Sequence, residues 1–143
     1  MSRTGSGGRT AAVTRRGLAF GVTNALFTLA FLFSIVVQLN DPDPFAWVLI
    51  YGIAAVACVL AQLRRGHWLL PAAIATGAGV WALTIAPRVM GQVRFLDMFG
   101  AFEMENVGIE ESRELYGLLI IILWMVVLTV RQARRPVERR GHG

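Results

Sequence analysis

The strongest constraint on this chain is a run of 22 residues without a charge, Leu18 to Leu39. A helix of that length rises about 33 Å, enough to cross the hydrocarbon core of a bilayer. Three further apolar runs follow, at residues 45–63, 68–86 and 115–130. With 55 % hydrophobic and 16 % charged residues, the chain is too apolar for an ordinary soluble domain. The sequence therefore predicts an all-α membrane bundle of four transmembrane helices running alternately up and down.

The ends of the chain differ from these runs in composition. Residues 1–16 are mostly Gly, Ser, Thr and Arg, and we expect them to form a disordered basic tail. Residues 131–143 are a second basic tail. Between them we expect a transmembrane domain over residues 17–130, with helices at 18–39, 45–63, 68–86 and 111–130.

The fourth apolar run is shorter than a span requires. Its 16 residues give a helix of about 24 Å, against a hydrocarbon core of about 30 Å. We therefore expect residues 111–114, Glu-Ser-Arg-Glu, to form the first turn of this helix at the membrane boundary. Acidic side chains in that turn complement the partial positive charge of a helix N-terminus.

The first and second runs are separated by QLNDPDPFAW, residues 38–47. Each proline in it, Pro42 and Pro44, removes a backbone donor and disfavours helix at the residue before it. Asp43 followed by Pro44 is typical of an N-cap followed by the first helical residue. This stretch predicts a tight reversal at the membrane surface.

The third run and the connection after it have their own patterns. In the third run, small residues recur at four-residue spacing: Ala75 with Gly79, and Ala78 with Ala82. They allow close approach of helix backbones in lipid, so we expect this helix inside the bundle. Pro87 is expected to end it. Residues 88–109 have apolar side chains near helical spacing, which predicts a short interfacial helix between helices three and four.

Basic and acidic residues fall on opposite sides of the membrane in this arrangement. With four spans in series, the side that holds both termini carries 11 Arg and one acid, Glu138. The other side carries three Arg and eight acids. By the positive-inside rule both termini are cytoplasmic, in a multi-pass protein of the cell membrane. The arginines lie at the ends of the apolar runs, a pattern that argues against nucleic-acid binding.

This orientation places two acidic stretches on one outer face. Asp41 follows the C-terminal end of the first helix, where the helix dipole disfavours a carboxylate, and Arg113 is the natural partner. The candidate polar site consists of Asn40, Asp41, Asp43, Glu111, Arg113 and Glu114, with Gln38, Tyr51 and Tyr116 as polar neighbours. Asp41 and Arg113 then form a staple between helices, or the surplus carboxylates bind a hard cation or a cationic head group.

The residues QLNDPDPFAWVLIY and EESRELYGLLIIILW resemble the two signature stretches of the transmembrane protein 220 family. The likeness runs from about Gly17 to Val127. The positions that match the family pattern are Gln38, Asn40, Asp41, Pro42, Asp43, Trp47, Tyr51, Glu111, Arg113, Glu114 and Gly117. The resemblance implies a small multi-span membrane protein and no particular reaction. The Arg-rich C-terminal tail departs from members in which apolar sequence continues.

The sequence is compatible with three kinds of function. The first is a non-enzymatic membrane protein, structural or an accessory subunit of a larger membrane complex, with the bilayer as its other partner. The alternative is a cation- or amine-binding or transport protein that uses the carboxylates. An intramembrane enzyme with paired carboxylates has no cofactor motif to support it. No cofactor is expected, since Cys58 has no second cysteine and His67 fits a solvated loop.

Overall fold

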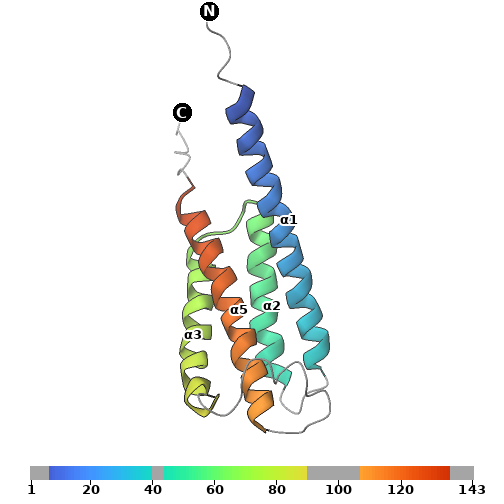
Figure 1. Cartoon of the computed structure of the whole chain (residues 1–143), viewed down its shortest axis with the longest axis vertical. Coiled ribbons are helices and arrows are strands. Elements are labelled where there is room, and N and C mark those ends of the chain that lie inside the picture. The colour runs from blue at the N-terminus through green and yellow to red at the C-terminus, as the bar shows by residue number, and fades with distance from the viewer. Residues whose placement is uncertain (1–6, 40–43, 90–106, 136–143) are drawn as a thin grey trace, which may run out of the picture. The chain divides into compact units, whose positions relative to one another are not determined.

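The computed structural model describes residues 7–39, 44–89 and 107–135 (Figure 1). Its regular secondary structure in these ranges is entirely α-helical: α1 (Gly7–Gln38), α2 (Pro44–Gln62), α3 (Leu69–Val89) and α5 (Val107–Ala133). Each helix includes a stretch that is long and apolar enough to cross a membrane. The expected all-helical class, with four helices long and apolar enough to span a membrane, is therefore confirmed, and the alternating up-and-down arrangement of all four stays a prediction. Most of the expected interfacial helix lies outside the described residues.

The chain forms two compact units. The N-terminal unit, Met1–Gly66, contains α1 and α2, and the C-terminal unit, His67–Gly143, contains α3 and α5. In each unit the two helices pack against each other.

In the N-terminal unit, α1 and α2 run antiparallel. Near one end Phe31 of α1 contacts Tyr51 of α2, with ring centroids 6.2 Å apart. Further toward the start of α1, Asn24 reaches Cys58 of α2. Earlier residues of α1 thus contact later residues of α2, as expected for antiparallel helices. The buried side of α2 is rich in alanine, at positions 54, 55, 57 and 61, and such small residues allow close helix packing.

The start of α1 corrects our expectation of a disordered tail. The helix begins at Gly7 instead of Leu18, so residues 7–16 are helical. Once the spanning segment has formed a helix, each added residue gains a hydrogen bond without a new nucleation cost. Ala11, Ala12 and the arginines at 15 and 16 also favour helix.

The end of α2 is a Schellman turn whose left-handed residue is an arginine. Arg65 N donates to Leu60 O over 2.9 Å, and Arg64 N donates to Ala61 O over 3.2 Å. These two bonds satisfy carbonyls that the end of a helix leaves without partners. Arg64 has φ 58°, a left-handed conformation that side chains with a Cβ disfavour. The turn therefore uses a charged residue where glycine is the usual choice.

Replacing Arg64 by glycine is expected to stabilise the N-terminal unit by about 0.5–1 kcal/mol, because glycine adopts φ > 0 without steric cost. Thermal unfolding in a zwitterionic detergent measures the effect. Arg65→Gly is the matched control, because the backbone of Arg65 does not have a positive φ and glycine relieves no strain at that position. Equal melting temperatures for Arg64→Gly and wild type would contradict the strain argument.

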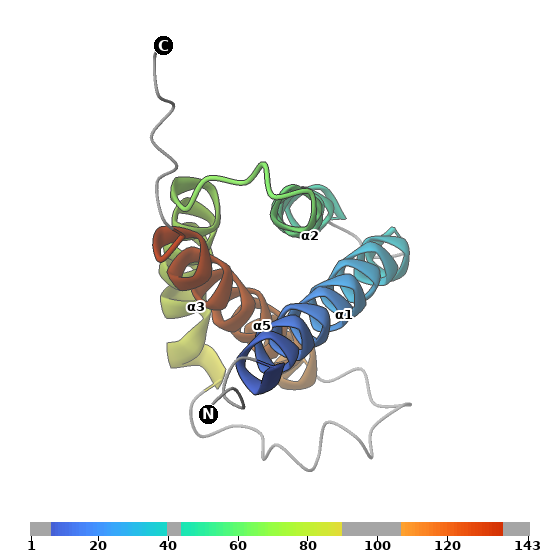
Figure 2. The same ribbon diagram turned by 90° about the horizontal axis from the view of Figure 1, so that it is seen from above.

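In the C-terminal unit, α3 and α5 lie side by side and antiparallel, with α3 starting at the end where α5 finishes (Figures 1 and 2). Four fully buried residues follow one another on α5 at spacings of three and four: Leu118, Ile121, Met125 and Leu128. This spacing makes a continuous apolar seam along one face of the helix. On α3 the small residues Ala78 and Ala82 are buried, whereas Ala75 and Gly79 are half-buried, so close packing holds for one of the two predicted pairs.

Two boundaries in this unit differ from the expected ones. Pro87 was expected to close the third helix, but α3 continues through it to Val89. In the last turn a proline costs a single backbone hydrogen bond, so two further residues can stay helical. Helix α5 begins at Val107, four residues before Glu111, and continues to Ala133. Glu111 to Glu114 are therefore helical, as expected, but they follow the first turn instead of forming it.

Candidate functional site

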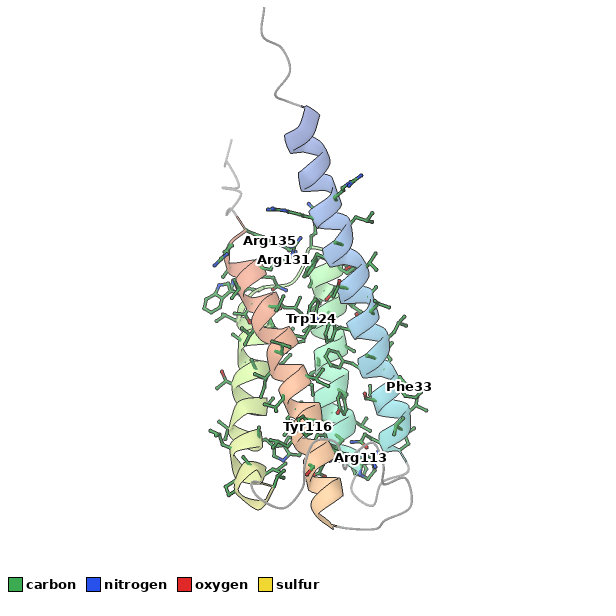
Figure 3. All side chains as sticks on the ribbon, in the orientation of Figure 1. Phe33, Arg113, Tyr116, Trp124, Arg131 and Arg135 are labelled. Atoms are coloured by element: carbon green, nitrogen blue, oxygen red, sulfur yellow. The ribbon has the colours of Figure 1, made fainter. Side chains whose placement is uncertain are left out.

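The start of α5 carries the described part of the predicted polar site. Glu111 is in the helix, although its side chain lies outside what the structure describes. Ser112 is buried, Arg113 is exposed, and Glu114 and Tyr116 are half-buried. The segment from Ser112 onward belongs to the stretch that can cross a membrane, so these polar groups stand at its boundary. Figure 3 shows Arg113 and Tyr116 at the same end of α5.

The first acidic stretch is only partly described. Asn40, Asp41 and Asp43 lie outside the described residues. Gln38 is half-buried as the last residue of α1. Tyr51 is buried in the N-terminal unit, where its ring lies 6.2 Å from Phe31 and 6.1 Å from Trp47. Its described ring contacts are thus aromatic packing, and the pairing of Asp41 with Arg113 stays a prediction.

Metal binding at the described residues has no structural support. Within residues 7–39, 44–89 and 107–135, no group of three His, Cys, Asp or Glu side chains is arranged to hold an ion. His67 accepts a hydrogen bond at Nδ1 from Leu69 N over 3.3 Å. This bond satisfies one of the free amides at the start of α3. Exposed His67 therefore has a helix-capping role.

A buried amide in the N-terminal unit was missed by our sequence reasoning. Asn24 is fully buried on α1. Its Nδ2 donates to Cys58 O over 2.8 Å and to Gln62 Oε1 over 3.0 Å, both on α2. An added Cβ at Gly21 would lie 3.4 Å from Gln62 Nε2, an ordinary van der Waals distance, so Gly21 of α1 lies beside that side chain. The available signal was an asparagine within a spanning run, since amides there hydrogen-bond across helices.

The described hydroxyl groups of the spans mostly bond within their own helices. Thr28 Oγ1, for example, donates to Asn24 O over 2.8 Å. The others of this kind are Thr23 to Ala19, Ser34 to Ala30, Thr76 to Ala72, Thr84 to Trp81, and Thr129 to Met125. These groups are satisfied in lipid without a second helix.

A second buried amide occurs near the end of α5. Gln132 is 7 % exposed and takes the next position of the seam after Leu128. Neither its Nε2 nor its Oε1 has a hydrogen-bond partner among the described residues. A buried amide without partners lowers stability, because it loses its bonds to water and gains none. The chemistry available at the two amides is hydrogen bonding between helices.

Comparisons with known proteins give one family. The model of a family described as transmembrane family 220, helix, matches residues 30–130. Among curated proteins, the chain is similar to transmembrane protein 220 of Xenopus laevis, with 31 % identity over 96 residues. That match covers 64 % of this chain and 48 % of the relative, so the chain spans about half the length of the curated relative. No solved structure gives a significant match.

Proposed function

The chain belongs to transmembrane family 220, and we propose that it is a non-enzymatic accessory or structural subunit of a larger membrane complex. It is a small multi-pass membrane protein with four candidate spans. We place it in the cell membrane with both termini cytoplasmic. The separation of 11 Arg from eight acids supports that orientation.

The exposed apolar surface of α1 carries the subunit proposal. Only 11 % of the spanning window of α1 is buried, against 44 % for α2. Leu29 and Phe33 are more than half exposed, and Figure 3 shows Phe33 pointing away from α2. Exposed apolar surface of this kind needs lipid or another transmembrane helix to cover it. We propose that a partner helix covers it.

Purification in a mild detergent tests the subunit role. We expect tagged protein to elute with a partner in fixed stoichiometry, measured by light scattering and quantitative mass spectrometry. The variant Leu29→Ala/Phe33→Ala is expected to lose the partner and keep its melting temperature, because both side chains are exposed. The control Val80→Ala/Leu83→Ala changes exposed residues of α3 and should keep the partner. Elution of the protein alone, as a monomer, would contradict the proposal.

For the polar site we propose a staple between Asp41 and Arg113 on the outer face. Asp41 follows α1, whose C-terminal dipole disfavours a carboxylate, and Arg113 is the cation of the second acidic stretch. A double-mutant cycle with Asp41→Asn and Arg113→Gln measures their interaction. We expect a coupling of about 0.5–1 kcal/mol in the free energy of unfolding, typical of partly exposed ion pairs.

The same variants separate the staple from the alternative cation or amine site. A staple predicts coupling between Asp41 and Arg113 with no change of melting temperature when calcium or a quaternary amine is added. A binding site predicts a rise in melting temperature that Glu114→Ala removes. Additive effects of the two substitutions, within the error of the cycle, would exclude the staple.

A further inference from the structure

Four exposed arginines gather at one end of the N-terminal unit: Arg15, Arg16, Arg64 and Arg65. The heights of the two pairs along the unit can be compared because Gly21 of α1 lies beside Gln62 of α2: a Cβ added at Gly21 would lie 3.4 Å from Gln62 Nε2. Arg16 is five residues before Gly21, or about 7.5 Å along the helix axis. Arg64 comes two residues after Gln62. Figure 1 shows that the first half of α1 continues past the end of α2 at this end of the unit.

The described part of this unit contains no carboxylate to neutralise these cations. Residues 7–39 and 44–66 include neither Asp nor Glu. The unit's two acids, Asp41 and Asp43, are in the connection that follows the opposite end of α1. On the side of the chain's termini, Glu138 is the single acid against 11 Arg. The described residues of this unit therefore leave the four arginines free to pair with an anion from outside it.

The position of the arginines suits a phosphate group at the membrane surface. The spanning stretch of α1 begins at Arg15, and that of α2 ends at Gln62, just before Arg64. Guanidinium groups at these levels extend to the lipid head groups while their stems cover apolar surface. A guanidinium also binds phosphate through two parallel hydrogen bonds.

The backbone at Arg64 gives a second, independent indication. Its φ of 58° is strained for any residue with a side chain, and the Schellman turn would be more stable with glycine there. A charged and exposed side chain kept in a strained conformation is a signal of function. We propose that Arg15, Arg16, Arg64 and Arg65 bind the phosphates of anionic phospholipids in the adjoining leaflet. The inference does not depend on the proposed subunit role.

Thermal unfolding of the full-length protein in lipid nanodiscs tests the proposal. We compare nanodiscs of phosphatidylcholine with nanodiscs in which part of that lipid is replaced by phosphatidylglycerol. The wild type is expected to melt several degrees higher with phosphatidylglycerol, and high salt should reduce this rise. Arg15→Gln/Arg16→Gln and Arg64→Gln/Arg65→Gln are each expected to lose at least half of it. Arg64→Lys/Arg65→Lys, which keeps the charge but not the planar fork, should lose less.

The control Arg139→Gln/Arg140→Gln removes the same charge from a tandem pair in the C-terminal tail and should keep the full rise. Arg64→Gly keeps the test decisive if a double variant does not fold, because it should melt higher in phosphatidylcholine and still respond less to phosphatidylglycerol. Equal responses of the test and control variants would overturn the proposal. An equal rise with inorganic phosphate in phosphatidylcholine nanodiscs would show a site for free anions instead of lipid.

Discussion

Replacing Asn24 by alanine is expected to lower the free energy of unfolding by about 2 kcal/mol, since a lost interhelical hydrogen bond and a new cavity add together. Asn24 is fully buried, and its Nδ2 donates to both Cys58 O and Gln62 Oε1. The substitution removes the side-chain hydrogen bonds of Asn24 to α2. Reversible unfolding in mixed micelles of mild and denaturing detergent measures the loss.

Thr23→Ala is the matched control for Asn24→Ala. Thr23 is exposed on α1, and its hydroxyl donates to Ala19 O of the same helix. Its replacement should change the free energy of unfolding by about 0.5 kcal/mol or less, as for most surface substitutions. If Asn24→Ala unfolds like Thr23→Ala, the amide does not hold α1 against α2.

The second large expected effect is an increase in the free energy of unfolding. Gln132→Met is expected to raise the free energy of unfolding by about 1–2 kcal/mol, because it removes a buried amide that has lost its bonds to water. Gln132 is 7 % exposed, and neither amide atom is hydrogen-bonded to a described residue. Methionine is of similar length and flexible, so it can fill the same space in the seam of α5. The same detergent titration measures the gain.

The same substitution at Gln62 separates this argument from a general preference for methionine. Gln62 Oε1 accepts a hydrogen bond from Asn24, so Gln62→Met should destabilise the N-terminal unit. Opposite signs at positions 62 and 132 are the expected result. A loss of stability with Gln132→Met would show that this amide has a partner in the membrane, such as a water molecule or another chain.

The polar site could be predicted from the sequence only in part. The shortness of the fourth apolar run correctly predicted that Glu111 to Glu114 would be helical, because a bilayer has a nearly constant thickness. The pattern did not reveal the role of Asn24, although an amide inside a spanning run was visible. The charged residues of the candidate site mark the membrane surface, whereas the interhelical hydrogen bonds of α1 lie within the span.

Helix ends were the least predictable part of the fold. The start of α1, eleven residues before Leu18, depends on helix propagation beyond the membrane, which hydrophobicity does not report. The passage of α3 through Pro87 depends on how near the proline is to the last turn. Both errors have one cause, since apolar runs mark the membrane-buried part of a helix and not the helix itself.

The sequence by itself determined that the chain is helical and has four segments long and apolar enough to cross a membrane. That result follows from run length and charge, which act residue by residue against the thickness of the bilayer. Only the tertiary structure decided which buried amide is satisfied. Asn24 and Gln132 are both polar residues on packed helix faces, but Asn24 meets a carbonyl and an amide of α2, whereas Gln132 has no described partner. A hydrogen bond needs two groups within about 3 Å, and for these amides that distance depends on how one helix is placed against another.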